Sequence, residues 1–546
     1  MSRSVADPTR SREERAMEFD AIVVGAGFSG LYMLHKLRDG VGLSVRVLEA
    51  GDGVGGTWYW NRYPGARCDS ESHYYSYSFS KELEQEWEWS ERYPEQPEIM
   101  RYLNHVADRF DLRRDIQFKS RVTEASYDEA ANRWNIRTDS GERLTAKFFI
   151  PAVGCLSAAN IPRIAGLGSF QGTWYHTGEW PHEGVDFTGK RVGLIGTGST
   201  GIQATPVIAA LAAHLTVFQR TPNYSIPARN APLSPEFQKY VKENYAEIRR
   251  KTRESTNGHP FEIADRSALA IAPEERQALY EDAWQHGGLR FRATFKDIMV
   301  NKEANDTAAD FIRSKICQIV KDPAVAAKLM PLDHPFATKR PPIDSDYFET
   351  FNRENVLLVD LRESPIEAIT PAGVRTGNAE YPLDIIVFAT GFDAMTGPML
   401  RMDIRGKNGL LLKNAWAAGP RTYLGLQVAG FPNMFTVTGP GSPSVLCNMP
   451  VAIEQHVDWI ADCIGYIRER GLHSIETTPE AAERWVSHVN DAANATLLPM
   501  AGSSWYLGAN VPGKPRVFMP YAGGMATYRN ICEAVAAKGY EGFVLR

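Results

Sequence analysis

The chain has 546 residues, 43% of them hydrophobic and 23% charged, with a formal net charge of -5. This length predicts three or four domains, the composition is that of an ordinary globular protein, and the charge gives no basic footprint for nucleic acid. The longest apolar runs, near 207–215 and 383–389, are too short to cross a bilayer. The six cysteines show no C-x-x-C or metal-ligand spacing. This indicates free thiols in a reducing cytoplasm and no metal site.

Residues 1–17 are polar, carry charges of both signs and lack the apolar core of a signal peptide. We therefore expect a disordered tail that precedes the first folded element.

The first glycine-rich turn follows a β-prone run at 19–24 and precedes leucines at helical spacing. In Gly25-Ala-Gly-Phe-Ser-Gly30, Gly25 allows a tight turn and Gly27 lets the backbone approach a pyrophosphate. Gly30 lets the helix pack on the strand. The helix N-terminus would hold the phosphates, because its amides and dipole favour anions.

Glu49 ends the next predicted strand, at 44–48. A carboxylate at this point binds both hydroxyls of an adenosine ribose and repels a 2′-phosphate. This half of the chain is therefore predicted to bind FAD or NAD, not NADP.

A glycine- and aromatic-rich loop at 55–69 comes next. The flat ring of Trp58 can cover a flavin, and Asp69 places an acid beside it. Asp69 can equally be a turn or cap carboxylate. Tyr75 belongs either to this aromatic wall or to ordinary core packing, and Val122 lies in a strand-like run.

The stretch 170–181 contains an unusual set of residue types, namely Phe170, Gly172, His176, Trp180 and Pro181. It is too short and too mixed for a helix or a buried strand, and its glycines and proline are breakers. We expect a linker loop between two nucleotide-binding domains. The alternative is an ordinary aromatic loop with a satisfied His176.

The second glycine-rich turn lies between a strand at 191–195 and an apolar helix that extends to residue 213. The strand at 215–218 is followed by Arg220, at the position that corresponds to Glu49 in the first half. A guanidinium matches phosphate oxygens, so this half is predicted to bind NADPH, although Arg220 can also be a solvated surface charge. The predicted NADP-binding residues are Gly196, Thr197, Gly198, Ser199, Thr200, Gly201, Arg220 and Thr221.

Residues 233–331 are charged and helix-prone, which predicts a helical insert with solvated faces. The insert is followed by Lys339 and Arg340, which two prolines would hold in a rigid basic loop; a solvated basic pair is the alternative. A buried strand within 384–393, a further strand at 433–442 and a long amphipathic helix at 451–470 are expected after it.

Two patterns in the chain resemble signatures of the type I Baeyer–Villiger monooxygenases. They are G-G-x-W-x-x-x-x-Y-P-G-x-x-x-D, from Gly55 to Asp69, and F-x-G-x-x-x-H-x-x-x-W-P, from Phe170 to Pro181. The resemblance extends from Phe19 to about Arg529, and the overall look is that of members acting on phenylacetone, cyclohexanone and steroids.

The resemblance implies an α/β fold with two Rossmann-like dinucleotide-binding domains and a helical insert in the NADP domain. The FAD-binding domain would comprise 18–154 and 390–546. The NADP-binding domain would comprise 155–232 and 332–389, with the insert at 233–331.

The resemblance also implies a reaction. NADPH reduces FAD, O₂ gives a C4a-peroxyflavin, and a ketone becomes an ester or lactone through a Criegee intermediate. Arg340 and Asp69 are the candidate catalytic residues, and Lys339 would hold the 2′-phosphate. Val122, Met449 and Trp505 become candidate cofactor contacts. Trp505 lies in a segment, 502–513, that resembles a mobile lid, although it could equally anchor a core. His176 is expected to control domain movement, not chemistry.

Two alternatives stay open at this stage. One is a flavin monooxygenase that oxidises nitrogen or sulfur, and the other is a non-catalytic flavoprotein. A disulfide reductase is disfavoured because no cysteine pair follows the first turn. The expected partners are a small ketone and O₂, with no nucleic acid and no membrane. We expect a monomer or a weak homo-oligomer in the cytoplasm.

Overall fold

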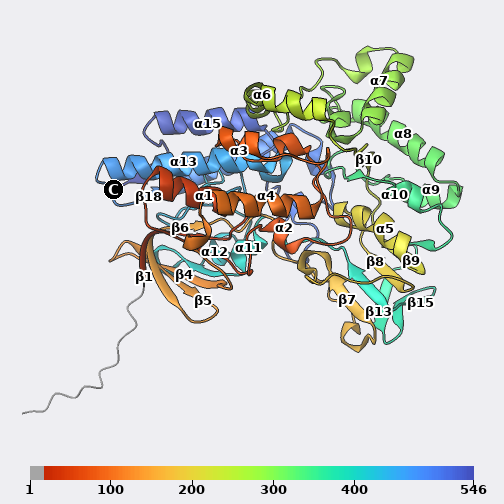
Figure 1. Cartoon of the computed structure of the whole chain (residues 1–546), viewed down its shortest axis with the longest axis horizontal. Coiled ribbons are helices and arrows are strands. Elements are labelled where there is room, and N and C mark those ends of the chain that lie inside the picture. Colours follow the sequence, from red (N-terminus) through yellow and green to blue (C-terminus); the bar gives the residue numbers. More distant parts are fainter. Residues whose placement is uncertain (1–16) are drawn as a thin grey trace, which may run out of the picture.

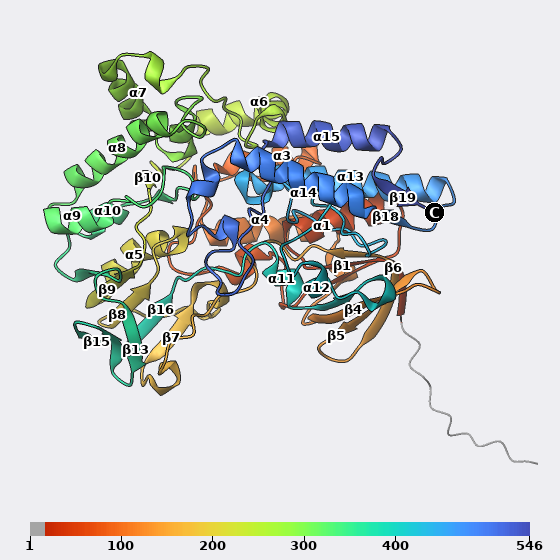
Figure 2. The same cartoon turned by 180° about the vertical axis from the view of Figure 1, so that it is seen from behind.

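The computed structural model describes residues 17–546 and contains two separate main sheets with helices packed around them (Figures 1 and 2). Of the tail expected at 1–17, only Met17 is among the described residues, and it begins the first strand. None of the helices in 17–546 has the length and apolarity needed to span a membrane.

The first sheet has seven strands, in the order β17-β4-β5-β6-β1-β2-β3. Its centre is parallel, because β1 pairs in parallel with both β2 and β6, whereas β4, β5 and β6 are joined as antiparallel neighbours. The strands are β1 (Met17–Val24), β2 (Val45–Leu48), β3 (Ile116–Gln117), β4 (Val122–Asp128), β5 (Arg133–Thr138), β6 (Arg143–Pro151) and β17 (Asp403–Arg405).

The second sheet has five parallel strands, in the order β12-β9-β8-β16-β7. The last four residues of β8 and all of β16 are buried, as expected for a parallel sheet covered on both faces. The strands are β7 (Thr173–His176), β8 (Arg191–Ile195), β9 (His214–Gln219), β12 (Val356–Asp360) and β16 (Ile385–Phe388).

The prediction of a linker loop at 170–181 was wrong for its central part. Residues Thr173–His176 form β7, which pairs in parallel with β16 and becomes the edge of the second sheet. The period-2 signal is weak, because this short edge strand exposes Thr173 and Trp174 and buries only His176.

Two helices that follow strands complete the nucleotide-binding halves. Helix α1 (Phe28–His35) follows β1 and packs against the long helix α13 (Met449–Glu469), and α5 (Ser199–Leu211) follows β8. The other helices of the first half are α2 (Thr57–Trp60), α3 (Lys81–Glu86), α4 (Gln96–Arg109), α11 (Gly397–Leu400), α12 (Leu412–Ala415), α14 (Pro479–Asn494) and α15 (Met525–Ala537).

The insert is helical, as predicted, and is drawn in green at one end of the molecule in Figure 1. It contains α6 (Pro235–Glu254), α7 (Pro273–His286), α8 (Lys302–Ile319) and α9 (Pro323–Leu329). The pairing of β10 (Ile226–Pro227) with β11 (Ile343–Asp344) joins the chain before and after the insert. A short helix, α10 (Tyr347–Thr350), follows β11.

The strand predicted at 433–442 is absent from the described residues, where only an isolated bridge links Met434 to Phe149. Positive φ at Asn433 and Thr438 and the glycines of this segment interrupt the extended geometry.

The remaining strands are β13 (Ile366–Thr370), β14 (Gly373–Thr376), β15 (Glu380–Pro382), β18 (Ile475–Thr477) and β19 (Phe543–Leu545).

Candidate active site

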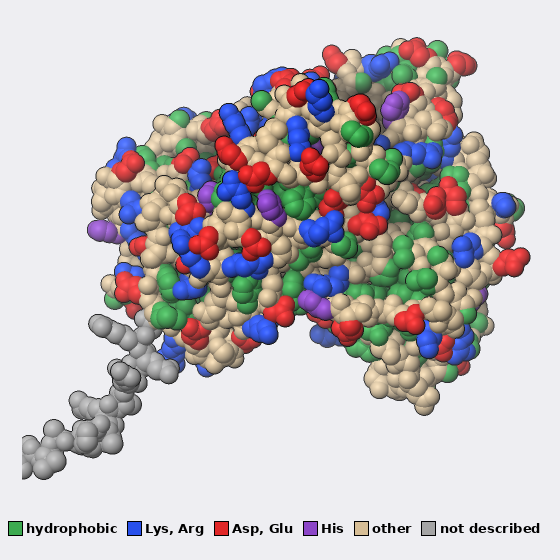
Figure 3. Space-filling model, in the orientation of Figure 1, with side chains coloured by type: hydrophobic (Ala, Val, Ile, Leu, Met, Phe, Trp, Pro, Cys, Tyr) green, Lys and Arg blue, Asp and Glu red, His purple; other side chains and the backbone are tan. Residues whose placement is uncertain are grey.

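A cavity of about 1770 Å³ runs between the two sheets and contains both glycine-rich turns. The outline of the molecule is indented between the two lobes that carry the sheets (Figure 3). Ligand pockets are usually roughly 300–1,000 Å³, so this cavity has room for more than one ligand. Its walls include most of the predicted site, namely Gly25, Gly27, Glu49, Trp58, Asp69, Tyr75, Val122, Gly196, Thr197, Gly198, Ser199, Thr200, Arg220, Thr221, Lys339, Arg340, Met449 and Trp505.

The first turn has the geometry of a phosphate cradle. Gly25 has φ +102°, and a Cβ on Gly30 would lie 1.7 Å from the Gly25 carbonyl oxygen. Gly30 itself is not part of the cavity wall; it lies under the turn, where the helix meets the strand. Gly27 is the N-cap of α1 and supplies no side-chain cap, so the first-turn amides remain donors at the cavity.

Glu49 is fixed at the end of β2 by two backbone amides. Its carboxylate oxygens accept hydrogen bonds from Ala26 N–H and Gly51 N–H, both at 2.7 Å. Burial raises its pKa, and these amides act in the opposite direction. The carboxylate is thus held at the cavity with remaining acceptor capacity, which fits ribose hydroxyls.

The second turn repeats this arrangement. Gly196 has φ +113°, and a Cβ on Gly201 would lie 2.1 Å from the Gly196 carbonyl oxygen, so Gly201 also lies under its turn. In contrast, no atom lies within 4 Å of a Cβ placed on Gly198. The backbone at Gly198 therefore faces open cavity, as close approach of a pyrophosphate requires. Thr197 Oγ1 donates to the Thr221 carbonyl at 2.9 Å.

Two cations lie near this second turn. Arg220 is exposed and follows β9, whereas Lys339 is partly buried. Burial lowers the pKa of Lys339, the charge of Asp333 raises it, and the charge of Arg220 lowers it. Arg220 and Lys339 are thus close enough to repel, and a phosphate between them would relieve that repulsion.

Arg340 and Asp69 form a bidentate ion pair across 271 positions of sequence. Arg340 Nε donates to Asp69 Oδ2 at 2.5 Å, and Nη2 donates to Oδ1 at 2.8 Å. A third bond runs from Nη1 to the Val445 carbonyl at 2.8 Å. Burial opposes both charges, but the partner outweighs it: the pKa of Asp69 is lowered and that of Arg340 is raised. Both groups are therefore charged at neutral pH.

Aromatic and apolar residues line the cavity around this pair. Trp58 Nε1 donates to the Tyr75 hydroxyl at 3.1 Å, and the two rings meet edge to face. Met449 begins α13 and Trp505 begins a short 3-10 helix, Trp505–Leu507. Val122 begins β4 and is buried.

Comparison with known proteins identifies the family. A Baeyer-Villiger monooxygenase of Pseudooceanicola batsensis is 46% identical over 539 residues, which is 98% of this chain and 98% of that protein. The chain belongs to the Baeyer–Villiger monooxygenase family. A solved structure described as oxidized steroid monooxygenase bound to NADP is 55% identical, covers 97% of this chain and 99% of its own, and superposes with a TM-score of 0.93.

Two further findings place the family more broadly. Residues 22–278 match the family model described as pyridine nucleotide-disulphide oxidoreductase. The phenazine N-monooxygenase PhzNO1 of Lysobacter antibioticus is 46% identical over 96% of this chain and 97% of that protein. Similarity of this degree thus extends to an enzyme that is named for oxidising nitrogen.

The residues of the 170–181 signature of these monooxygenases do not line the cavity. His176 is buried; its Nδ1 accepts a hydrogen bond from Gly178 N–H at 3.0 Å, and burial lowers its pKa to about 4. Within residues 17–546, His176 Nε2 has no partner. Trp180 packs between Tyr175 and Phe187, and Phe170 packs into the cluster behind β16.

Gly172 and Pro181 also have structural surroundings. A Cβ on Gly172 would lie 2.3 Å from the Asp384 carbonyl oxygen, and the Pro181 carbonyl accepts from Gly184 N–H at 3.3 Å. The signature therefore shapes the edge of the second sheet, and its neighbours Gly178 and Glu179 reach the cavity.

Sequence reasoning missed contacts that join the two halves. Tyr63 donates to Gln203 Oε1 at 2.8 Å, and Gln203 Nε2 donates to the Arg67 carbonyl at 3.1 Å. Lys514 pairs with Asp393 at 2.5 Å and thereby ties the end of the 502–513 segment to the chain that returns from the second sheet. Nothing in the local sequence marks these pairs, because each joins positions far apart in the chain.

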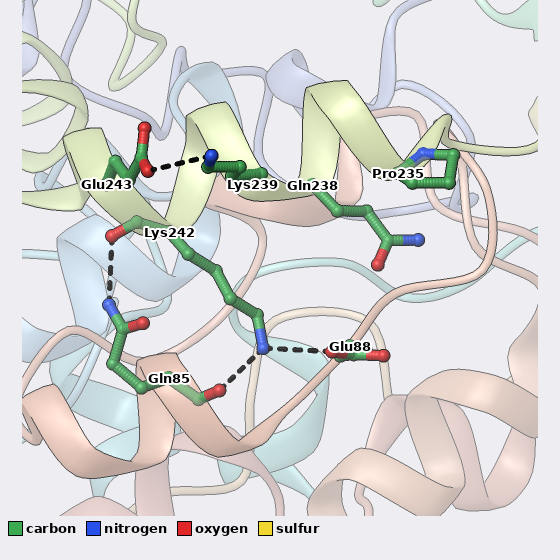
Figure 4. Close-up of a pocket in the computed structure, with 7 residues that line it drawn as sticks. All are labelled: Gln85, Glu88, Pro235, Gln238, Lys239, Lys242 and Glu243. Atoms are coloured by element: carbon green, nitrogen blue, oxygen red, sulfur yellow. Dashed lines mark hydrogen bonds and ion pairs between the residues drawn. The ribbon is translucent and has the colours of Figure 1, made fainter.

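A separate hollow of about 680 Å³ lies on the surface between α6 and the segment after α3 (Figure 4). Lys242 Nζ crosses it, donating to the Gln85 carbonyl at 2.6 Å and to Glu88 at 3.2 Å. This hollow contains none of the predicted site residues. Across the described part of the chain, no cluster of His, Cys, Asp or Glu has the grouping of a metal site.

Proposed function

We propose that this protein is an FAD-containing, NADPH- and O₂-dependent monooxygenase that converts ketones to esters or lactones. The overall reaction consumes ketone, O₂, NADPH and a proton and gives ester, NADP⁺ and water. The observation that carries the proposal is the Arg340–Asp69 pair, which lies in one cavity with two different dinucleotide turns.

The two turns fit different cofactors, FAD and NADP(H). The cradle at Gly25 and Gly27, with Glu49 beyond it, fits the pyrophosphate and ribose of FAD. The cradle at Gly198, with Arg220 and Lys339, fits NADPH and its 2′-phosphate. When bound, FAD supplies the two-electron chemistry that connects NADPH, O₂ and the ketone.

Arg340 is assigned the central role in the chemical step. Negative charge develops on oxygen as a ketone carbonyl is attacked, and a fixed cation in a water-poor site stabilises it. An arginine suits this position because it stays protonated and cannot quench an anion by giving up its proton. Asp69 acts through Arg340: its two acceptor oxygens hold the guanidinium plane, while Val445 fixes the third side.

The substrate class and setting are further parts of the proposal. The apolar and aromatic lining by Trp58, Tyr75, Met449 and Trp505 suits cyclic, aryl or linear ketones. Six unpaired cysteines and the use of NADPH are consistent with a reducing cytoplasm. We propose a monomer or weak homo-oligomer.

Oxidation of nitrogen is the second candidate, because a nitrogen-oxidising relative is 46% identical over nearly the whole chain. Oxidation of nitrogen and oxidation of a ketone differ in how strongly they depend on Arg340. A nucleophilic nitrogen needs no stabilisation of a developing carbonyl oxyanion, so Arg340 would be less important than it is for ketones.

The test is product analysis with isotopically labelled dioxygen. Purified holoenzyme is incubated with NADPH, ¹⁸O₂ and a panel of ketones, amines and sulfides. An ester or lactone with one ¹⁸O atom supports the proposal. Labelled N-oxides or S-oxides without any ester would replace it with the second candidate, and absence of NADPH consumption with every compound would favour a non-catalytic flavoprotein.

Arg340→Ala provides the matching residue test. We expect the variant to keep FAD and to oxidise NADPH, but to form no ester, because the cavity loses the charge that stabilises the oxyanion. Ester yield equal to that of the unmodified enzyme would refute the role of Arg340.

A further inference from the structure

Among residues 17–546, Arg292 has no charge partner. It lies in the 3-10 helix Gly288–Ala293 of the insert and is partly buried. Arg340, Arg249 and Arg92 each bind a carboxylate, whereas no ion pair of Arg292 exists among residues 17–546. A cation removed from water is costly unless it is paired, so an unpaired one needs an explanation.

The insert brings this helix close to the cavity wall. The Ala293 carbonyl accepts a hydrogen bond from Ala264 N–H at 2.9 Å. Arg290 lies 5.3 Å over the ring of Phe261, which stacks on His259 at 5.2 Å. These contacts hold the helix against segment 259–264.

The segment just before His259 packs on the wall of the cavity itself. A Cβ on Gly258 would lie 3.1 Å from Asn448 Cβ, and the neighbours of Asn448, Cys447 and Met449, line the cavity. Within 17–546, two buried polar atoms here have no hydrogen-bond partner, His259 Nδ1 and Asn448 Oδ1. Unsatisfied polar groups thus gather where the insert meets the site.

The charges at this place do not balance. Burial and then the charge of Arg340 lower the pKa of Arg292, and only the Tyr506 hydroxyl acts in the opposite direction. Asp69 is already occupied by Arg340. Burial, with the charges of Arg340 and Arg292, lowers the pKa of His259 to about 3, so His259 is neutral at pH 7. Within the part of the chain that the structure describes, the positive charge of Arg292 therefore has no compensating carboxylate.

We propose that Arg292 is a specificity residue that binds an anionic group, of the carboxylate class, on the ketone substrate. The inference rests on the proposed function and deepens it: the preferred substrate is a keto acid, with its carbonyl at Arg340 and its carboxylate at Arg292. A guanidinium matches a carboxylate with two parallel hydrogen bonds, which makes it selective for this group over a neutral one of the same shape.

Two pairs of compounds test the preference. The first is 4-oxocyclohexanecarboxylate beside its primary amide, and the second is 4-acetylphenylacetate beside its primary amide. We expect the unmodified holoenzyme to favour the acid in kcat/KM in at least one pair, by roughly tenfold or more, because a hydrogen-bonded charge is being recognised. Arg292→Met should abolish this preference while turnover of the amide is retained.

Arg290→Met is the matched control. Arg290 is an exposed cation two residues away on the same 3-10 helix, and methionine keeps an apolar side chain over Phe261. The substitution therefore changes net charge equally while the helix stays packed. We expect this variant to keep the preference for the acid. Loss of preference in both variants would mean a general charge effect and would overturn the assignment.

A binding measurement separates failure of this inference from failure of the proposed function. Cyclohexanecarboxylate and cyclohexanecarboxamide cannot be oxidised as ketones, so their affinities for the holoenzyme are measured by calorimetry without turnover. Tighter binding of the carboxylate that disappears in Arg292→Met supports the site even if no ketone reacts. Equal binding of the two probes, or turnover of both ketone pairs without a preference for the acid, would overturn the inference.

Discussion

Replacement of Asp69 by asparagine tests how strongly the carboxylate orients Arg340. The native pair has two charge-assisted hydrogen bonds, at 2.5 and 2.8 Å. Asparagine keeps one acceptor and turns its amide hydrogens toward the guanidinium, so one bond from the charged guanidinium remains. Hydrogen bonds to charged groups contribute about 1.5–3 kcal/mol each, so the loss of one is about 1.5–3 kcal/mol.

The exposure of the pair reduces this figure. The two side chains are 23% and 25% exposed, and solvent screening brings the expected loss to about 2 kcal/mol. If that energy serves to hold Arg340 in place, ester formation should fall on the order of 30-fold, at 1.36 kcal/mol per tenfold change in rate. NADPH oxidation should continue, so the ratio of ester to NADPH should fall with it.

The assay measures ester and NADPH consumption together, beside the thermal unfolding midpoint. Asp384→Asn is the control, because Asp384 forms the same bidentate contact with Arg191 on the surface, away from the cavity. We expect the control to retain full ester yield. Ester formation by Asp69→Asn within about threefold of the unmodified enzyme would refute the reasoning, because it would leave less than the energy of one neutral hydrogen bond for the orientation of Arg340.

Three further outcomes follow from the geometry. Gly198→Ala should weaken NADPH binding but leave the unfolding midpoint unchanged, because the added Cβ meets only open cavity. Gly201→Ala should lower the midpoint, because its added Cβ would lie 2.1 Å from a carbonyl oxygen. Equal midpoints for the two variants would contradict this. Arg220→Gln should raise KM for NADPH about tenfold and leave KM for NADH unchanged, since only NADPH has the 2′-phosphate; a parallel change in both would contradict the assignment. Burial lowers the pKa of His456 to about 3, so its contribution to stability is complete above pH 6.5 and is lost as pH falls toward 3. Its neutral Nδ1 accepts the Thr438 N–H, so thermal unfolding between pH 7.5 and 5.5 should depend less on pH in His456→Gln.

The two nucleotide-binding turns could be predicted because their signals are local. Each combines an apolar strand, three glycines at fixed spacing and a helix, and each glycine has its own steric reason within a few residues of sequence. The difference in cofactor preference between the halves could also be predicted from the sequence, because Glu49 and Arg220 each follow the second strand of a half. The structure places both side chains on the cavity wall.

The parts that could not be predicted depend on partners far away in the chain. Strand β7 forms only because β16, more than 200 positions later, offers a free edge; its own residues look like a loop. The segment 433–442 is the opposite case. Its apolar residues predicted a strand, but in the folded chain it forms turns. Arg292 looked like one of many solvated charges of the insert. Only the folded chain shows that it is partly buried and has no carboxylate partner among residues 17–546.

Lys339 and Arg340 are consecutive residues of one loop, and together they connect the two halves of the cavity. Lys339 and Arg220 both line the cavity that contains the second turn, while Arg340 reaches Asp69 in the first half. The loop is anchored immediately afterwards, since the Pro342 carbonyl accepts a hydrogen bond from Ile226 N–H at 3.0 Å in the β10–β11 pair. Because the two residues share one anchored loop, a backbone shift caused by a phosphate at Lys339 would also shift Arg340. We therefore expect occupancy of the second dinucleotide site to influence the position of the Arg340 charge.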